Sequence, residues 1–478
     1  MGIKLHNIEL LSSVEKKIFH LLPERIGEYV ESGHRWKKSN YVTTIRSKEG
    51  ILLYNTLLNS PMIANEMAQQ YFDALSEFAF PTDPCSEEEE CQFSFAESLL
   101  FLPINVSEED IISVQSNDYL RKFSRGVLFD TIDIRVSESC NFGCAHCIAG
   151  KSKRDTLMTF GQAKNIIDYI VSMKVNSNQN NLKLHYGNAE PIINVKIIQQ
   201  IHDYIESVYP FIVLQESLNT NLSLINENLV NWFKENKIQV YASLDGNKDG
   251  NDKIRVLKNG QGTYDIILDK LYLFEKTGYP LKGISVTITD DNYDYVKDDF
   301  IDWCIKQDFT SVAYDFDLIN MVNISIEEAA DFLVSTWRKF RNAGVEFYGT
   351  WATLFLNISN NSYLSEVYGF CSAKIGRNLS INSDGVVYPC AFSSIPVCDL
   401  KNLGEAITPH NSFYTFVKSN LLKMNSTCFQ EKCRYVGACV GQCEVTKEYG
   451  EEKAKHQCEF YRKVTDKMLL AQLQYEDF

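Results

Sequence analysis

The chain has 478 residues, and at about 100–200 residues per domain this length suggests roughly three domains. Hydrophobic residues make up 45% and charged residues 23%, which excludes a disordered or fibrous protein. The 62 acidic and 47 basic side chains give a net charge of −15, whereas a general nucleic-acid binder needs basic surface.

Location and cysteine content point to metal chemistry. No apolar run approaches the roughly 20 residues that cross a bilayer, and the first residues lack the apolar core of a signal peptide. We therefore expect a cytoplasmic protein with no membrane or nucleic-acid partner. Because cytosolic thiols stay reduced, the 14 cysteines predict metal ligation rather than a disulfide framework.

The first 125 residues show a mixed pattern that is typical of a small binding module. Residues 41–46 and 50–55 predict a β-hairpin, and residues near 61–78 and 107–117 predict helices. The acidic run 86–90 predicts a solvated loop. Cys85 and Cys91 flank this run and are interpreted as loop thiols.

From residue 129 onward, strands alternate with helices. Strands are predicted at 129–136, 182–186, 211–219, 238–244, 284–289 and 311–318, and helices at 159–174, 193–208, 226–236, 263–277 and 293–306. Thr159 and Ser325 stand at capping-box spacing before helices. Six strand–helix units in tandem predict an α/β fold with a parallel sheet, either doubly wound or a partial barrel. Cys304 falls in a predicted helix and is interpreted as a buried apolar residue.

The sharpest local pattern follows the first of these strands. Cys140, Cys144 and Cys147 have the spacing Cx3Cx2C, so one loop presents three thiolates to three irons of a [4Fe–4S] cluster. The fourth iron then stays open to a small molecule. The alternatives are free thiols or a zinc site with His146 as fourth ligand.

This motif resembles the radical S-adenosylmethionine (radical SAM) superfamily, which implies a partial (β/α)6 barrel. Residues 186–191 are similar to the YGGEP motif, 219–222 to TNG, 243–246 to SLDG, and 251–263 to HDxxR…GxGT. The resemblance implies that Glu190 contacts the SAM amino group, Ser243 the ribose and Arg255 the methionyl carboxylate. The segment 187–190 differs by one added residue and one lost glycine, and Leu222 replaces another glycine. His185, beside this segment, is interpreted as a core histidine rather than a catalytic one.

After residue 365 the apolar periodicity fades and eight cysteines follow, seven of which have a pattern that resembles the SPASM domain of peptide-modifying radical SAM enzymes. The resemblance implies two auxiliary [4Fe–4S] clusters. The inner one would use Cys371, Cys390 and Cys443, and the outer one Cys428, Cys433, Cys439 and Cys458. The inner cluster is one ligand short, which Cys398 or a substrate thiolate would supply. Zinc at these cysteines remains the alternative.

The resemblance implies four regions and one main function. The regions are 1–125, a small α+β, winged-helix-like domain for a leader peptide; 126–320, the radical SAM partial barrel; 321–370, a helical bridge; and 371–478, the SPASM domain. The enzyme would cleave SAM reductively to a 5′-deoxyadenosyl radical and take hydrogen from a ribosomal precursor peptide. It would then form a thioether, weakly favoured over a carbon–carbon crosslink.

Two alternatives to that function stay open. One is a sulfatase-type maturase that makes formylglycine, and the other is a non-catalytic iron–sulfur binding or regulatory protein. An electron donor such as flavodoxin or ferredoxin is the further partner that the resemblance implies. No residue is assigned as a catalytic base.

Overall fold

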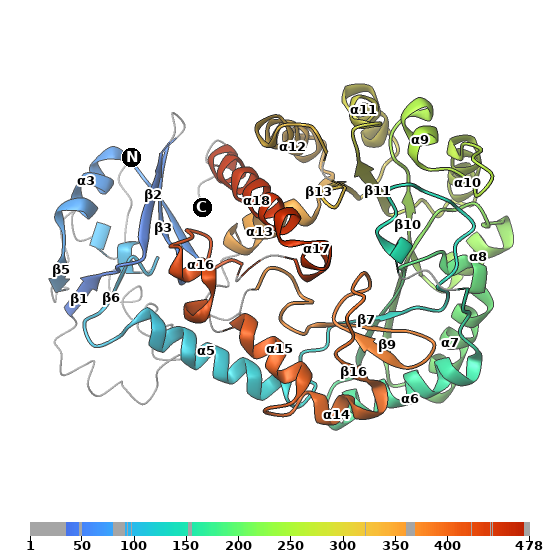
Figure 1. Ribbon diagram of the computed structural model, residues 1–478, viewed down its shortest axis with the longest axis horizontal. Coiled ribbons are helices and arrows are strands. Elements are labelled where there is room, and N and C mark those ends of the chain that lie inside the picture. The colour runs from blue at the N-terminus through green and yellow to red at the C-terminus, as the bar shows by residue number, and fades with distance from the viewer. Residues whose placement is uncertain are drawn as a thin grey trace.

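The computed structural model describes residues 35–46, 50–79, 91–92, 94–96, 98–151, 155–320, 322–359, 369–421, 423–439, 441 and 443–472. Three sheets lie within these residues: one large mixed sheet and two small antiparallel ones. Figure 1 shows the two small sheets gathered at one end of the molecule and the strand–helix array at the other. The C-terminal cysteine-rich segments lie between them.

The N-terminal unit contains more strand than the sequence predicts. One sheet has the order β5–β1–β6 and the other β2–β3–β4. The strands are β1 (Arg35–Lys38), β2 (Val42–Arg46), β3 (Ile51–Asn55), β4 (Ser60–Ala64), β5 (Glu77–Ala79) and β6 (Phe101–Pro103), and the helices are α3 (Glu66–Ala74) and α5 (Glu108–Phe123). The predicted hairpin is confirmed as β2 and β3. The winged-helix-like detail of the prediction is not established by this pair of three-stranded sheets.

The predicted helix over 61–78 is wrong at both ends. Residues 60–64 pair with β3 as an edge strand, where Pro61 is tolerated because the outer side needs no N–H. The helix starts only after Asn65, whose side chain accepts from the N–H of Ala68. The predicted loop over 86–90 and Cys85 lie outside the described residues, and Cys91 packs against the N-terminal core.

Six parallel strands form the centre of the large sheet in chain order, as predicted. They are β7 (Thr131–Ile134), β8 (Asn181–Tyr186), β9 (Val213–Thr220), β10 (Gln239–Ser243), β11 (Gly283–Ile288) and β12 (Ser311–Phe316). The connecting helices are α6 (Phe160–Asn176), α7 (Val195–Val208), α8 (Glu227–Glu235), α9 (Lys248–Ile254), α10 (Tyr264–Lys276) and α11 (Asp298–Lys306). Thr159 and Gln162 form the predicted capping box of α6. Alternate strand residues are buried against these helices, and the residues between them face the inside of the arc.

The sheet continues beyond the six predicted strands on both sides. After α12 (Ile326–Asn342), β13 (Glu346–Tyr348) pairs with β12, and the short helix α13 (Thr353–Ser359) follows. On the other side β14 (Asn378–Ile381) runs parallel to β7, and β15 (Val386–Tyr388) and β16 (Cys398–Asp399) extend the sheet antiparallel. The cysteine-bearing hairpin is therefore a continuation of the barrel sheet.

The C-terminal region wraps back over the barrel and reaches the N-terminal unit. Its helices are α14 (Leu403–Ala406), α15 (Ser412–Leu421), α16 (Thr427–Gln430), α17 (Glu444–Glu448) and α18 (Glu451–Gln472), and α18 packs along α12. The N–H of Gly437 donates to the carbonyl of Thr56 at 2.8 Å, and a Cβ on Gly437 would lie 2.6 Å from that oxygen. Only glycine allows this approach, which fastens the N-terminal sheet to the outer cysteines.

Among the described helices, none combines the length and the hydropathy that a membrane crossing requires.

Candidate functional site

The loop from Cys140 to Cys147 follows β7 at the carboxyl end of the strand, where parallel α/β sheets bind ligands. Phe142 is buried and bridges to Leu257, and the N–H of Gly143 donates to the carbonyl of Val256 at 2.8 Å. These contacts hold the loop on the segment that follows α9. The three thiols of the loop, on Cys140, Cys144 and Cys147, are in no disulfide and are partly exposed.

Hydrogen-bond donors surround the sulfur atoms of this loop. The amide nitrogen of Asn221 lies 3.9 Å from Cys140 Sγ, and the N–H of Phe142 lies 3.4 Å from the same atom. Burial raises the pKa of Cys144, while the guanidinium of Arg255, 3.9 Å away, acts in the opposite direction. Donors to sulfur stabilise thiolate ligands. Three thiols on one loop with such donors therefore fit the ligand set of a [4Fe–4S] cluster.

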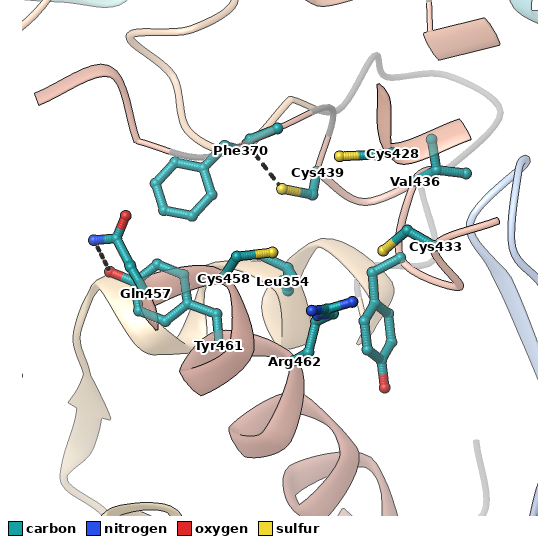
Figure 2. A pocket seen from close by; sticks show the side chains of 12 residues that line it. Leu354, Phe370, Cys428, Cys433, Val436, Cys439, Gln457, Cys458, Tyr461 and Arg462 are labelled. Carbon is teal, nitrogen blue, oxygen red and sulfur yellow. Dashed lines mark hydrogen bonds between the residues drawn. The ribbon is translucent and has the colours of Figure 1, made fainter. Parts of the chain in front are cut away.

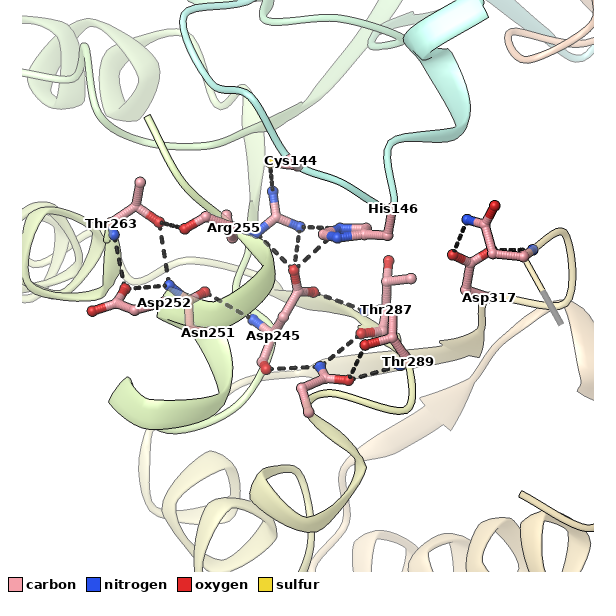
Figure 3. Close-up of polar contacts among 12 residues, drawn as sticks. Cys144, His146, Asp245, Asn251, Asp252, Arg255, Thr263, Thr287, Thr289 and Asp317 are labelled. Carbon is pink, nitrogen blue, oxygen red and sulfur yellow. Dashed lines mark hydrogen bonds and ion pairs between the residues drawn. The ribbon is translucent and has the colours of Figure 1, made fainter. Parts of the chain in front are cut away.

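A buried carboxylate organises the far side of this loop, as Figure 3 shows. Asp245 is fully buried and accepts from Nε and Nη2 of Arg255, each at 2.8 Å. His146 Nε2 lies 3.3 Å from the same carboxylate oxygen, and the N–H of Thr287 donates to the other oxygen at 2.8 Å. Arg255 thus donates from Nε and Nη2 to Asp245, and its Nη1 lies toward Cys144. Its predicted contact with the methionyl carboxylate stays a prediction.

Glu190 joins the ends of two neighbouring strands. Its carboxylate accepts from the N–H of Ile192 at 3.1 Å, the hydroxyl of Thr220 at 2.7 Å and the N–H of Asn221 at 2.8 Å. Burial raises the pKa of Glu190 to about 7, and the donors on Asn221, Thr220 and Ile192 oppose that rise. The side chain therefore holds the Asn221 turn in place, and a SAM amino group would have to share an oxygen that already has a protein partner.

The two positions where the sequence departs from the family glycines keep a glycine-like backbone. Asn188 has φ of +81° and Leu222 has φ of +62°. This left-handed conformation is costly for a residue with a Cβ. Both residues thus adopt the backbone conformation that a glycine would adopt more easily, and the two loops carry the resulting backbone strain. Ser243, at the carboxyl end of β10, is half-buried and pairs in register with Ser285 of β11.

The inner group of C-terminal thiols comes together around the β14–β15 hairpin. Burial raises the pKa of Cys371 to about 11 and that of Cys390 to about 12, and Cys443 is a charged neighbour of both. The N–H of Phe392 donates to Cys390 Sγ at 3.4 Å. Cys398 lies on β16 opposite Val387 of β15, and burial raises its pKa to about 12.

Arg135 fixes the hairpin to the barrel. It is buried at the end of β7, with its guanidinium 4.2 Å from the ring centre of Tyr388. It donates to the hydroxyl of Ser380 at 2.9 Å and to the carbonyl of Cys390 at 3.1 Å. One side chain therefore sets the position of Cys390 relative to the first strand of the barrel.

The four outer thiols line one pocket with about 390 Å³ of space, counting its open mouth. Figure 2 shows Cys428, Cys433, Cys439 and Cys458 around it, with Arg462 beside them. Burial raises the pKa of Cys439, and the charges of the other three thiols raise it further. Among the described residues, no three Cys, His, Asp or Glu side chains are placed to share a single metal ion.

Sequence reasoning missed a polar row inside the barrel. Asp133, His185 and Ser217 stand side by side in register on β7, β8 and β9. His185 Nδ1 lies 2.9 Å from Ser217 Oγ, so its ring has the partner expected of a core histidine. Asp133 Oδ1 is buried and has no hydrogen-bond partner among the described residues. The alternation of β7 could have identified Asp133 as an inward-facing residue.

Comparison with known families agrees with this geometry. The model of the radical SAM superfamily matches residues 134–301, from the end of β7 into α11. The chain carries a radical SAM domain. This domain holds the cysteine loop and Glu190, Ser243 and Arg255.

Similar sequences extend over different parts of the chain. An uncharacterized protein of Methanocaldococcus jannaschii is 31% identical over 182 residues, which are 38% of this chain and 60% of that protein. The radical SAM cyclopropyl synthase TigE of Paramaledivibacter caminithermalis is 22% identical over 72% of this chain and 74% of its own length. A cysteine-type anaerobic sulfatase-maturating enzyme of Clostridium novyi is 25% identical over 66% of this chain and 87% of its own length.

Two solved structures share the fold. The sulfatase-maturating enzyme anSMEcpe with bound AdoMet superposes with a TM-score of 0.57 at 18% identity, covering 73% of this chain and 100% of that one. SuiB of Streptococcus suis bound to S-adenosylmethionine gives a TM-score of 0.50 at 16% identity, covering 88% and 98%.

Proposed function

We propose that this protein is a radical SAM peptide maturase that crosslinks a ribosomal precursor peptide. The observation that carries the proposal is the attachment of the C-terminal thiols to the radical SAM sheet. Strand β14 pairs with β7, the strand that leads into the cluster loop, and Arg135 ties Cys390 to the same strand. Chemistry at the barrel and electron transfer at the C-terminal thiols then belong to one site. Relatives named as a radical SAM cyclopropyl synthase and as a sulfatase-maturating enzyme support this class.

The first three thiols would hold the SAM-binding [4Fe–4S] cluster, and the two C-terminal groups the auxiliary clusters. When bound, the first cluster and SAM supply a 5′-deoxyadenosyl radical that removes hydrogen from an unactivated carbon. In a zinc site with Zn–S bonds of about 2.3 Å the thiols crowd around one ion. In an iron–sulfur cluster each thiolate binds its own iron. Zinc at these thiols stays the alternative, and the metal analysis described below separates the two.

The protein's own residues position the reacting groups. Asp245 holds Arg255 so that its guanidinium faces Cys144. Glu190 holds the turn at Asn221 so that the amide of Asn221 faces Cys140. Asp133 offers a buried acceptor inside the barrel for a proton that leaves the substrate. The inner group of Cys371, Cys390 and Cys443 supplies three thiols, so an inner cluster would keep one position for Cys398 or a substrate thiolate. A substrate thiolate in that position would favour a thioether over a carbon–carbon bond.

The N-terminal unit would bind the leader segment of the precursor. β2 and β4 are the outer strands of their sheet, and a peptide can add to such an edge through main-chain hydrogen bonds. Deleting residues 1–120 is a poor test, because it would remove Thr56 from Gly437 and disturb the outer cysteines. The better test truncates the peptide: we expect a leaderless peptide to bind at least tenfold more weakly than the full precursor. An electron donor such as flavodoxin or ferredoxin would serve the first cluster.

The sulfatase-type alternative rests on the relative from Clostridium novyi and on the fold of anSMEcpe. The resemblance to that enzyme group implies an Asp directly after the hairpin cysteine, with the role of a base. Here buried Ala391 follows Cys390, which counts against this alternative. The protein is offered, in separate reactions, a sulfatase peptide that contains the target cysteine and a precursor peptide that can be crosslinked. Only a sulfatase-type maturase would convert the first peptide to formylglycine, so the products separate the two functions.

The deciding experiment measures iron, sulfide and zinc per chain after anaerobic reconstitution, followed by SAM cleavage. We expect about 12 irons for three [4Fe–4S] clusters. The triple variant C140A/C144A/C147A should lose about four irons and all formation of 5′-deoxyadenosine. C304A is the matched control, because Cys304 is buried in α11 away from the three groups. Formation of 5′-deoxyadenosine by the triple variant would refute the assignment.

The precursor is then followed by mass spectrometry. An intramolecular crosslink removes two hydrogen atoms from the peptide, and blocking of its cysteine by alkylation distinguishes a thioether from a carbon–carbon bond. A protein that loads iron but never cleaves SAM would instead support the non-catalytic alternative.

A further inference from the structure

A buried cation lies between the two groups of C-terminal thiols. Lys374 is 2% exposed, which is rare for a lysine because burying a charge is costly unless it is paired. Its backbone N–H donates to the carbonyl of Cys371 at 3.1 Å, so it lies one turn after an inner thiol. The two residues are three apart in sequence, so the backbone of Lys374 stays close to the inner group.

The ammonium of Lys374 reaches the segment that joins the two groups. It forms an ion pair with Glu444, the residue directly after Cys443 of the inner group. It also lies against Gly441, where an added Cβ would be 3.9 Å from Nζ. Gly441 in turn accepts a hydrogen bond from Cys439 Sγ of the outer group at 3.0 Å. One ammonium therefore contacts a short segment that carries an outer thiol at one end and an inner thiol at the other.

The electrostatic effect of this cation reaches both groups. The charge of Lys374 lowers the pKa of Cys371 and of Cys439, although burial raises both overall. A second buried lysine behaves differently: Lys423 donates to the carbonyl of Gly437 at 2.5 Å, and Cys439 of the outer group is its charged neighbour. Of the two, Lys374 is the cation that faces both groups.

We propose that Lys374 is a positioning residue that sets the reduction potential of both auxiliary clusters. The inference rests on the proposed function, because it requires that the two thiol groups hold clusters. Reducing a cluster adds one negative charge, and the net charge and burial around a cluster set its potential. A fixed ammonium in a poorly solvated segment stabilises the added charge. Because it is shared, it raises the potentials of both clusters together.

The test is a potentiometric titration of the reconstituted holoenzyme, followed by electron paramagnetic resonance and with dithionite as the reductant. Lys374→Met keeps most of the stem and removes the charge. We expect the auxiliary midpoints to fall by at least 59 mV, the equivalent of a tenfold change in a one-electron equilibrium. Lys374→Arg keeps the charge and should stay near the wild-type midpoints. The exposed Lys418 on α15 supplies the control Lys418→Met, which should shift nothing.

The signal of the first cluster, identified by its change on adding SAM, serves as an internal reference. Wild-type midpoints in Lys374→Met overturn the inference. If that variant does not load its clusters, Glu444→Gln decides, because it leaves the ammonium without its counterion: a rise in the midpoints supports the inference and unchanged midpoints overturn it. A wild-type protein with about four irons fails the proposed function first, and the inference falls with it before any variant is compared.

Discussion

Replacing Asp245 with Asn should destabilise the protein more than a change of one atom suggests. Asp245 is fully buried and is the counterion of Arg255, whose side chain is also buried. Asn keeps the shape and an acceptor for the N–H of Thr287, so the loss is mainly that of the charge. Removing one partner of a buried ion pair costs about 3–5 kcal/mol, because the other charge is left without compensation.

The assay is urea unfolding of the metal-free protein, followed by circular dichroism and compared at constant m-value. The double variant Asp245→Asn/Arg255→Met decides the reasoning. If the cost comes from the orphaned guanidinium, the double variant should recover most of the stability that Asp245→Asn loses. If Asp245→Asn alone lowers the free energy of unfolding by less than about 1 kcal/mol, the reasoning is refuted, because exposed ion pairs contribute that little. It would mean that water or another group already compensates Arg255.

Three further predictions concern backbone strain, pH and the hairpin anchor. Gly246→Ala should lower the free energy of unfolding in urea by about 1–3 kcal/mol more than Gly260→Ala does. Both glycines have positive φ, but only a Cβ at position 246 would meet a carbonyl oxygen, 2.8 Å away. Equal losses in the two variants would contradict this. The hydrogen bond to Glu216 raises the pKa of His202, so its stabilisation is complete below about pH 6.5 and is lost as pH rises through the raised value. The stability gap between wild type and His202→Gln should therefore be larger at pH 5.5 than at pH 8, and a gap that widens with pH would refute the pairing. Arg135→Met should lower the iron content of the inner group, measured as iron per chain. It should also lower the free energy of unfolding in urea by about 1–3 kcal/mol for each carbonyl left unsatisfied. Full iron loading of this variant would show that the hairpin needs no anchor.

The strand–helix array could be predicted because its signals are local. Strands β8 to β10 alternate buried and more exposed residues, and the predicted limits of β8 to β12 differ from the observed ones by at most two residues. The helix that contains Cys304 starts at Asp298 rather than at residue 293, because residues 293–295 form a 3-10 turn. The outer cysteine group was predicted from its spacing, and its four thiols line one pocket. The ligand roles of the cysteines stay predictions.

Features that depend on distant partners could not be predicted. Residues 60–64 are apolar enough for a helix, and only their pairing with β3 makes them a strand. The four residues of β14 become part of the barrel sheet because β7 lies beside them. The bond between Asp245 and Arg255 likewise depends on how α9 returns toward the loop. In each case the deciding partner is set by tertiary structure rather than by sequence periodicity.

The pairing of β14 with β7 has a consequence for how the chain folds during synthesis. Thr131 of β7 pairs with Asn378 of β14. During synthesis, one edge of the first barrel strand therefore stays unpaired until its partner, about 250 residues downstream, has been made. At roughly 5–20 residues per second, the ribosome takes about 12–50 s to deliver it. Over that interval the thiols next to β7 are already made, while Arg135 has neither Ser380 nor the carbonyl of Cys390 to bond. Slow translation or oxygen in that window should therefore lower the yield of folded protein, and a chaperone that shields the open strand edge should raise it.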